Sequence, residues 1–416
     1  MIDPEQFRHS IGLSDIAIER VVFDEGNVLK IYVTSTKKGC HCHCCGAWIE
    51  DFFALGEEIS LRHLPMFGHQ VFIVLRPERY GCPRCEDRPT TTQTLDWYTP
   101  RSRLTKAFEQ EVLLTLINST VEDVSRKQAL GSDAIEGVLK RYVAEQVDWS
   151  RFTQLPIIGV DEIALKKGHR DFVTVVSARL ADGQLTILAI LADRTKATVK
   201  AFFKSIPKRL RATVELVCSD LYAGFLGAAK AVFGRRVAVC ADRFHVAKLY
   251  RDGVESLRKK EMRRLKGELS KTEYESLKNV HWILRKSDAD LSADERRIRR
   301  RVFEFSPKLH QAHALSEALT AIYEAPLTKG QGKRRLRAWI RRVTKRGLSC
   351  FNRFIKTLTT HLEIIANYFI ERQTSGFVEG LNNKIKVLKR RGYGFTNRKR
   401  LFQRVYLDLH GYALFG

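Results

Sequence analysis

The amino-acid sequence predicts a multidomain α/β protein, and three of its features indicate this. The chain has 416 residues. A single compact core rarely organises so many, so roughly two to four domains are expected. Runs of alternating apolar and polar residues, typical of strands, occur before residue 100 and again between residues 155 and 241. Residues 246 to about 370 contain almost none of these runs and follow the pattern of helices instead.

Lysine and arginine greatly outnumber aspartate and glutamate, which gives a formal net charge of +25 and a pI near 9.8. This excess exceeds what solubility requires and predicts a polyanionic partner whose affinity falls steeply as salt rises. The same composition also fits a ribosomal protein or a membrane-surface protein, so it fixes only the class of partner.

No segment of the sequence is long and apolar enough to cross a membrane. The longest apolar run, Leu185–Ala192, has the length of a strand and falls short of the roughly 18 residues that a spanning helix needs. The first residues, Met1–Phe7, lack the positive flank and apolar core of a signal peptide. We therefore expect a cytoplasmic protein, in which the nine cysteines serve as metal ligands or core residues rather than in disulfides.

Paired cysteine motifs mark the N-terminal region, which we assign to residues 1–98. Strand-like runs precede and separate the crowded cluster Cys40–Gly46 and the knuckle Cys82–Cys85. Two CxxC knuckles joined through strands predict a zinc ribbon, because thiolates around Zn²⁺ hold hairpins that have little core of their own. The alternative is a set of buried thiols without a metal. The predicted ligands are Cys42, Cys45, Cys82 and Cys85, with Cys40, His41, His43 and Cys44 open as substitutes.

The hydrophobic period changes from two to 3.6 residues in the next region, residues 99–150. Apolar positions predict helices around 108–117, 121–129 and 134–143. A turn at Leu130-Gly131 precedes the third helix, and this outline predicts a helix-turn-helix whose last helix enters a major groove. An ordinary three-helix spacer is the alternative. Ser132 and Asp133 supply a helix start, yet the acidic Asp133 and Glu136 count against DNA contact there.

Residues 155–241 order their predicted elements as three strands, a helix, a strand, a helix and a last strand. Asp182-Gly183 marks a hairpin between the second and third strands. This is the order of a ribonuclease-H-like domain, which we assign to residues 151–248 and 371–416. Residues 249–370 are then an all-helical insertion that interrupts this catalytic domain.

Three acidic residues occupy positions from which they can meet in that domain. Asp161 and Asp220 end the first and fourth strands, and Glu379 lies on a predicted helix after the insertion. Converging carboxylates require a cation, because like charges close together do not all ionise without one. Two Mg²⁺ ions held in this way activate an attacking oxygen and stabilise a leaving one in phosphodiester chemistry. A helix cap or a turn is the alternative role for each aspartate taken alone.

The motif Asp242-Arg-Phe-His245 follows the last strand. Asp242 and His245 are predicted to steady the active site or the DNA as accessory residues, and the alternative is a helix start with a buried histidine. Asp242 also competes with Asp220 for the place of the second acid.

Further accessory residues are predicted on the helix that carries Glu379. Asn382, Asn383 and Lys386 share its face at spacings of three, four and seven. We assign Asn383 and Lys386 as accessory residues, an amide able to contact phosphate and a cation.

Basic clusters interrupt the predicted helices with too few acids to balance them, notably between Lys384 and Arg400. A charge run is usually a solvated face, but this imbalance favours phosphate contact. The loop at residues 390–396 adds two aromatics suited to stacking on a splayed base. The predicted DNA-binding residues are Arg296, Arg300, Lys333, Arg334, Arg341, Lys389, Arg390 and Arg391.

In their order and spacing, these motifs resemble those of the ISL3 family of bacterial insertion-sequence transposases across essentially the whole chain. The resemblance implies a zinc-binding N-terminal domain, a helix-turn-helix and a DDE catalytic domain of ribonuclease-H-like fold. It carries over Asp161, Asp220 and Glu379 as the triad of metal ligands. The matching pieces are Cys42–Gly46 with Cys82–Cys85, Gly159–Glu162, Ser219-Asp220, Asp242–His245, and Gly376–Asn383 followed by Lys386.

The resemblance also implies a reaction and partners. Two Mg²⁺ or Mn²⁺ ions would serve hydrolysis at a transposon end, and the freed 3′-hydroxyl would then join target DNA by strand transfer. The zinc ribbon and the helix-turn-helix would recognise terminal inverted repeats. Pairing two ends predicts a homodimer on double-stranded DNA, in a nucleoid-associated protein. The alternatives are a DNA-binding regulator derived from a transposase and a structure-specific nuclease of the same fold.

Overall fold

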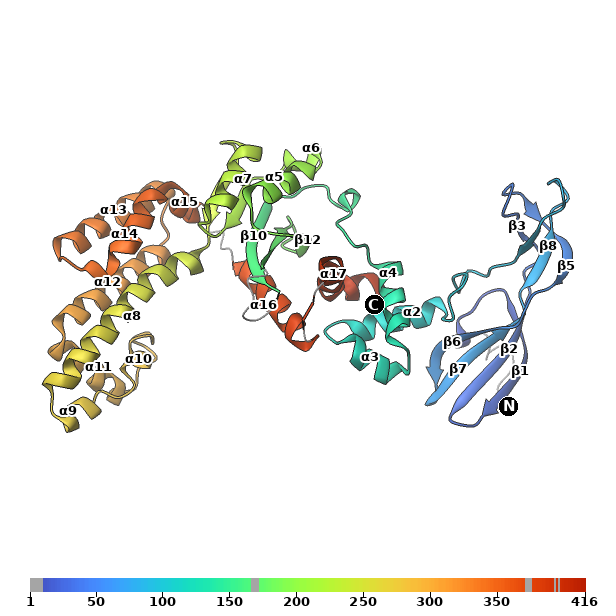
Figure 1. The fold of residues 1–416 in the computed structure, drawn as a ribbon, viewed down its shortest axis with the longest axis horizontal. Coiled ribbons are helices and arrows are strands. Elements are labelled where there is room, and N and C mark those ends of the chain that lie inside the picture. Colours follow the sequence, from blue (N-terminus) through green and yellow to red (C-terminus); the bar gives the residue numbers. More distant parts are fainter. Residues whose placement is uncertain (1–9, 166–171, 371–375, 393, 396) are drawn as a thin grey trace. The chain divides into compact units, whose positions relative to one another are not determined.

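The computed structural model describes residues 10–165, 172–370, 376–392, 394–395 and 397–416, and Figure 1 shows their elements. The chain divides into two compact units, Met1–Val143 with Tyr406–Gly416, and Ala144–Val405. Within the described ranges, no helix has both the length and the apolar character needed to cross a membrane.

Strands build the N-terminal part of the first unit, as the alternating runs predict. A four-stranded sheet has the order β1-β2-β7-β6, with a parallel central pair and antiparallel outer pairs. Every second residue of β2 is buried, which places Ile31 and Val33 in the core with Ile73. The strands are β1 (Ile16–Asp24), β2 (Val28–Ser35), β6 (Ile59–Met66) and β7 (His69–Leu75).

Short strands flank the two cysteine knuckles. The first knuckle lies between the paired strands β3 (Cys40–His41) and β4 (Trp48–Ile49). Gly46 closes it with φ +69°, a conformation that favours glycine, and its N–H donates to the Cys42 carbonyl at 2.9 Å. The second knuckle follows β8 in the sheet β5-β8-β9. Its strands are β5 (Asp51–Leu55), β8 (Glu78–Gly81) and β9 (Thr90–Thr92).

Three helices follow at the predicted positions, α2 (Lys106–Leu116), α3 (Val121–Gln128) and α4 (Ser132–Tyr142), and their apolar faces form one core. The left-handed residue of the α3–α4 turn is Ala129, with φ +49°. Gly131 is the N-cap of α4 and Ser132 is already helical, so Ser132 starts the helix without capping it.

The end of the chain completes this three-helix core. Leu407, on α17 (Arg398–Phe415), is buried in the same cluster, and Asp408 accepts a hydrogen bond from the Asn118 backbone at 3.0 Å. The sequence analysis assigned all of residues 371–416 to the catalytic domain. The structure differs because Tyr406–Gly416 covers apolar surface that α2, α3 and α4 leave open.

The second unit contains a five-stranded sheet of order β12-β11-β10-β13-β14. The strands β12, β11 and β10 are antiparallel neighbours, whereas β10, β13 and β14 are parallel. All five strands lie where the sequence predicts them. They are β10 (Ile157–Ala164), β11 (Phe172–Arg179), β12 (Leu185–Leu191), β13 (Leu216–Ser219) and β14 (Ala238–Ala241).

Helices cover this sheet. The helix predicted near 198–210 is two helices, α5 (Lys196–Ser205) and α6 (Lys208–Arg211), because Pro207 has no N–H to continue the ladder. With α7 (Ala223–Phe233), they bury Phe203 and Phe225 in a core shared with the strands. A short 3-10 helix, η1 (Trp149–Arg151), precedes β10.

The segment between β14 and residue 370 is almost entirely helical. Its core surrounds Trp339, which is 1% exposed and donates its Nε1 hydrogen to the Leu315 carbonyl at 2.7 Å. The helix α16 (Gly376–Arg391) then returns the chain to β10. The remaining helices are α8 (Arg243–Glu268), α9 (Lys271–Glu275), α10 (Val280–Ile283), α11 (Ala293–Phe305), α12 (Pro307–Glu324), α13 (Lys329–Lys345), η2 (Ser349–Phe351), α14 (Asn352–Thr360), α15 (Leu362–Ala366) and η3 (Asn367–Phe369).

Candidate functional site

Three aspartates lie where the parallel part of the sheet ends. Val160, Ser219 and Ala241 are the last parallel-paired residues of β10, β13 and β14, and they stand opposite one another. The residue that directly follows each of them in the chain carries a carboxylate. These residues are Asp161, Asp220 and Asp242.

Asp161 was predicted to end its strand, but the strand continues beyond it. β10 continues to Ala164 along its antiparallel partner, and Asp161 pairs with Val175 of β11. The apolar run ends earlier because β10 loses its parallel neighbour β13 after Val160. Asp161 is therefore the first residue of β10 that has a neighbouring strand on only one side.

Burial and mutual repulsion disfavour the charged forms of these carboxyl groups. The pKa of Asp161 is raised to about 6, mainly by burial, with smaller contributions from Asp220 and Asp242, while the Glu162 backbone N–H and His245 oppose the shift. Burial also raises the pKa of Asp220, with a contribution from Asp242. The cluster thus favours any cation that enters it.

Asp242 and His245 form an ion pair at the start of α8. Asp242 is the N-cap of this helix and accepts from the Phe244 backbone at 2.7 Å. The His245 Nδ1 atom lies 3.2 Å from the Asp242 Oδ2 atom. The Asp242 carboxylate raises the pKa of His245, and Asp161 and Asp220 act in the same direction. These carboxylates therefore favour the protonated form of His245.

Asn382 on α16 reaches the same carboxylates. It is 3% exposed, and its Nδ2 group donates to the Asp161 Oδ2 atom. Its own Oδ1 atom is buried and has no hydrogen-bond partner in the described part of the chain. The sequence analysis chose Asn383 and Lys386 on this helix, but both are exposed. The signal for Asn382 was present, because it follows the buried face of Val378, Leu381 and Ile385.

A glycine lets α16 approach β10. A Cβ atom at Gly159 would lie 2.5 Å from the Val378 Cγ2 atom and 2.7 Å from the Ser177 Oγ atom. Such distances are shorter than real Cβ contacts, so this packing requires glycine. Glu379 follows Val378 directly, is partly buried, and has no ion-pair partner among the residues that the structure describes.

The carboxylates are close but do not form a closed ligand set. Among the described residues, groups of three or more potential ligands within 4.8 Å of one another occur only among the N-terminal cysteines and His43. The ligand atoms of Asp161, Asp220 and Glu379 therefore do not all lie within that distance of one another.

Sequence reasoning missed an ion pair at the border of the cluster. Arg194, after β12, lies 2.9 Å from Glu162, the neighbour of Asp161. Its guanidinium group is 5.1 Å from the Tyr222 ring centre. Glu162 raises the pKa of Arg194, and Asp220 adds to this effect. The only signal in the sequence was an arginine just beyond a predicted strand.

The predicted DNA-binding residues fall into two groups. Arg296, Arg300, Arg334, Arg341, Arg390 and Arg391 are exposed, whereas Lys333 and Lys389 are partly buried. Three of the predicted residues have partners within the protein: Arg296 donates to the Asp288 carbonyl at 3.1 Å, Lys333 pairs with Glu363, and Lys389 donates to the Ala164 carbonyl. Burial lowers the pKa of Lys389. The aromatic Tyr393 of the 390–396 loop lies outside the described residues.

The helix α13 has a basic surface opposite its buried face. Gly332, Leu336, Trp339 and Val343 are buried on one side. The helix contains no acidic residue, and its exposed side carries arginines and a lysine. These are Arg334, Arg335, Arg337, Arg341, Arg342 and Lys345.

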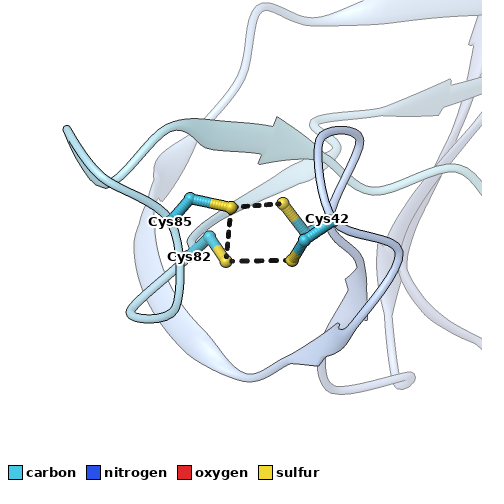
Figure 2. Close-up of side chains that lie close together, drawn as sticks. Cys42, Cys82 and Cys85 are labelled. Atoms are coloured by element: carbon cyan, nitrogen blue, oxygen red, sulfur yellow. Dashed lines mark hydrogen bonds between the residues drawn. The ribbon is translucent and has the colours of Figure 1, made fainter.

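The four cysteines predicted as zinc ligands converge in the first unit. Figure 2 shows the sulfur atoms of Cys42, Cys82 and Cys85 pointing toward one another. The Sγ–Sγ distances are 3.9 Å for Cys42–Cys85, 3.7 Å for Cys45–Cys82 and 3.6 Å for Cys82–Cys85. Four sulfurs about 2.3 Å from a tetrahedral Zn²⁺ ion stand about 3.8 Å apart. Hydrogen bonds from the backbone N–H groups of Cys45 and Cys44 lower the pKa of Cys42 to about 6.

The substitute ligands engage other groups. Cys40 donates to the Thr91 carbonyl, His41 Nδ1 lies 3.0 Å from the Gly46 carbonyl, and His43 Nδ1 lies 2.9 Å from Thr91 Oγ1. Cys44 is exposed, with its sulfur 3.2 Å from His43 Nε2. Cys42, His43 and Cys44 form a second, smaller group of potential ligands. The four-cysteine set is the more complete of the two.

Comparisons with known proteins agree with this arrangement. A family profile described as a transposase of the ISL3 type matches residues 158–405, and the helix-turn-helix domain of transposase family ISL3 matches residues 93–143. The transposase for insertion sequence element IS1001 of Bordetella parapertussis is 25% identical over 99% of this chain and 100% of that protein. The transposase for IS1557 of Mycobacterium tuberculosis is 23% identical over 82% of this chain and 80% of that protein.

The fold and these matches define the protein as a transposase with a helix-turn-helix DNA-binding domain. The chain belongs to the ISL3 family of transposases. The open choice between a helix-turn-helix and a three-helix spacer at residues 99–150 is thereby decided for the helix-turn-helix.

Proposed function

We propose that this transposase is a metal-dependent DDE enzyme, which hydrolyses a phosphodiester at the transposon end and joins the freed 3′-hydroxyl to target DNA. The observation that carries this proposal is that Asp161, Asp220 and Asp242 directly follow the last parallel-paired residues of three adjacent strands, with the helix of Glu379 packed on β10 at Gly159. The sheet order, three antiparallel strands followed by two parallel ones, supports a ribonuclease-H-like fold.

The residues at this edge fit a divalent cation. Their carboxylates repel one another, which raises the pKa of Asp161 beyond the effect of burial, and the buried Asn382 Oδ1 atom lacks a partner among the described residues. Oxygen ligands of this kind are those that Mg²⁺ or Mn²⁺ prefers. We infer that Asp161, Asp220 and Glu379 hold the ions. When bound, such ions activate an attacking oxygen and stabilise a leaving one.

Asp220 suits the second ligand position better than Asp242. One Asp220 oxygen accepts from the Tyr222 backbone at 3.0 Å, which leaves the other for a cation. Both Asp242 oxygens are engaged, one by the Phe244 backbone and the other by His245. Asp242 therefore begins α8 and orients His245.

The remaining polar side chains position the reacting groups. Asn382 donates to Asp161 and fixes the orientation of that carboxylate. His245 offers positive charge beside the carboxylates, where the backbone phosphates of DNA would lie. Asn383, Lys386 and the exposed arginines of α13 lie outside the cluster and suit contacts with phosphates further along the duplex.

The other regions serve DNA binding in this proposal. The four-cysteine cluster holds Zn²⁺ and fixes the knuckles between β3 and β9. With the helix-turn-helix it recognises the terminal inverted repeats. Residues 249–370 form an insertion within the catalytic domain that grips flanking DNA, and two copies pair the two ends. The proposed limits are 1–98, 99–150, 151–248 with 371–416, and 249–370, except that Tyr406–Gly416 packs on the helix-turn-helix.

A joining assay tests the proposal. The substrate is a labelled oligonucleotide duplex with the sequence of one end of the insertion sequence and a free 3′-hydroxyl, incubated with plasmid DNA and Mg²⁺. The wild-type protein is expected to join the two, and Asp161→Ala and EDTA are each expected to abolish joining. Equal joining by Asp161→Ala would refute the assignment. Binding without cutting or joining would favour a regulator, and cutting without joining a nuclease.

A further inference from the structure

The helical region contains a pocket that the proposed function leaves unused. Its volume is about 520 Å³, and it lies between α8, α10 and α12. On α8, Phe244, Lys248, Arg251 and Glu255 line it at spacings of four, seven and eleven, which is one face of the helix. His281 of α10 and His313 of α12 face them.

This pocket begins beside the carboxylate cluster. Phe244 lines the pocket, and its backbone N–H donates to Asp242 at 2.7 Å. Its ring packs edge to face on His245 with centres 5.8 Å apart. Arg251 lies seven residues further along α8, about 10 Å at the helical rise. A DNA strand covers that distance in about three nucleotides, since each advances about 3.4 Å in a duplex.

An exposed tryptophan stands next to the pocket. Trp282 on α10 is 61% exposed, whereas Trp339 of the same region is buried at 1%. Its ring lies 4.7 Å from that of His281, and the Arg285 guanidinium group lies 5.7 Å from its centre. Both neighbours line the pocket. Packing of the core does not explain Trp282, and an exposed aromatic among cations is a stacking surface for a base.

The charges and polar atoms of the pocket suit a nucleotide. Five lysine and arginine side chains line it against three aspartate and glutamate side chains. Glu255 is paired with Arg258 at 2.6 Å, whereas Lys248 and Arg251 have no acidic partner within 4 Å in the described chain. His313 is 9% exposed, and its Nε2 atom is buried without a hydrogen-bond partner among those residues. Burial lowers the pKa of His313, so its neutral ring can accept a hydrogen bond from a base.

We propose that this pocket and Trp282 bind one unpaired nucleotide of the DNA strand that flanks the cleavage site. The base stacks on Trp282, and the adjoining phosphates contact Lys248 and Arg251. The proposal rests on the proposed function, because the carboxylates define where the cleaved phosphodiester lies. A pocket of about 520 Å³ matches a ligand the size of a nucleotide and excludes a duplex.

Binding of two DNA probes to the full-length protein tests this inference. Both are duplexes with the sequence of one end of the insertion sequence, in EDTA so that no cleavage occurs. One is fully paired. The other carries 2-aminopurine opposite an abasic site near the cleavage position. The wild-type protein is expected to bind the unpaired probe more tightly and to quench its 2-aminopurine emission by stacking.

Variants separate the tryptophan from the basic surface. Trp282→Ala is expected to weaken binding of the unpaired probe by about fivefold to a hundredfold, the range for one base–aromatic contact, and to leave the paired probe unchanged. Trp282→Phe retains a ring and most of the affinity. Trp48→Ala removes a tryptophan that is 40% exposed in the other unit and serves as the matched control. Arg337→Ala, on the basic side of α13, lowers both affinities alike.

If Trp282→Ala binds each probe as tightly as the wild-type protein does, or loses the same factor of affinity for both, the pocket assignment is overturned. Retained joining activity together with that result refutes this inference alone. Conversely, a preference for the unpaired probe that depends on Trp282, in a protein that never cuts DNA, supports the pocket and refutes the proposed reaction.

Discussion

The cysteine cluster and the carboxylate cluster are both candidate metal sites, yet they are built in opposite ways. The cysteines come from two knuckles of one small domain, and their sulfurs already stand 3.6 to 3.9 Å apart. The acidic residues come from separate strands and from α16, some 160 residues further along the chain. They do not form a group of three within 4.8 Å among the described residues.

This difference is the one expected between a structural metal site and a catalytic one. A structural zinc site is complete with four protein ligands, whereas a catalytic site keeps positions open for substrate and water. The carboxylate cluster keeps one Asp220 oxygen and the Asn382 Oδ1 atom without protein partners in the described ranges. In the cysteine cluster, all four sulfur atoms belong to one group of potential metal ligands. Four predictions test this contrast, from the largest expected effect to the smallest.

Loss of one cysteine ligand should have an all-or-none effect. Cys82→Ser is expected to lose its zinc entirely and to expose residues 40–92 to protease, because zinc binding provides the folding free energy of such knuckles. Zinc content per chain, measured by mass spectrometry, checks this. Cys44→Ser, which changes an exposed cysteine outside the four-cysteine set, is the control and should keep its zinc. A full zinc equivalent in Cys82→Ser would contradict the assignment.

At the carboxylate cluster, substitutions of Asp220 and Asp242, the two candidates for the second metal ligand, should differ in effect. Asp220→Asn is expected to lower the rate of DNA joining by about a thousandfold or more, since metal ligands contribute several kcal/mol of charge stabilisation. Asp242→Asn keeps a capping oxygen and is expected to lose about tenfold through His245. Rates at saturating Mg²⁺ check this. The reverse order would assign the second ligand to Asp242.

The activity of the carboxylate cluster should also depend on packing between distant segments. Gly159→Val places methyl groups where Val378 and Ser177 already lie, which should cost about 1 to 3 kcal/mol of stability. Because the same contact holds the helix of Glu379, joining activity should fall further than stability does. Thermal melting and joining rates, measured together, check this. Gly137→Ala, at an unobstructed glycine of α4, is the control and should change neither by much.

The last prediction concerns stability alone and the buried carboxyl group of Asp161. Its folded-state pKa of about 6 exceeds the unfolded value of 3.8. The stability that this group contributes is therefore present below pH 3.8 and is lost as pH rises through 6. Asp161→Asn should stabilise the metal-free protein by at most about 3 kcal/mol at pH 7.5, a pKa unit being 1.36 kcal/mol. Melting temperatures from pH 4 to 8 check this. Equal gains at both ends of that range would exclude charge as the cause.

The sequence predicts the local elements well, because hydrophobic period and turn residues act over short distances. The five strands of the second unit and the three helices of the helix-turn-helix lie where these patterns indicate. The convergence of Cys42, Cys45, Cys82 and Cys85 was also expected from the CxxC spacing. Each of these predictions depends on neighbouring residues or on one repeated motif.

Contacts between distant segments are harder to predict from the sequence. Asn382 and Asn383 are both polar and adjacent, and only the rotation of α16 against β10 decides which one meets Asp161. The engagement of Lys389 with the Ala164 carbonyl depends on the same packing. Arg194 was missed because its partner Glu162 comes from another strand. The three-dimensional packing, rather than residue type, determines these roles.

The packing of Leu407 and Asp408 on the three-helix core has a consequence for synthesis of the protein. The helices at residues 106–142 leave the ribosome early, but the residues that close their apolar surface emerge more than 250 residues later. The DNA-binding domain therefore reaches its final stability only after the whole sheet and the helical region have been synthesised. A chain that terminates before residue 400 would carry every strand of the sheet and still lack a complete helix-turn-helix core.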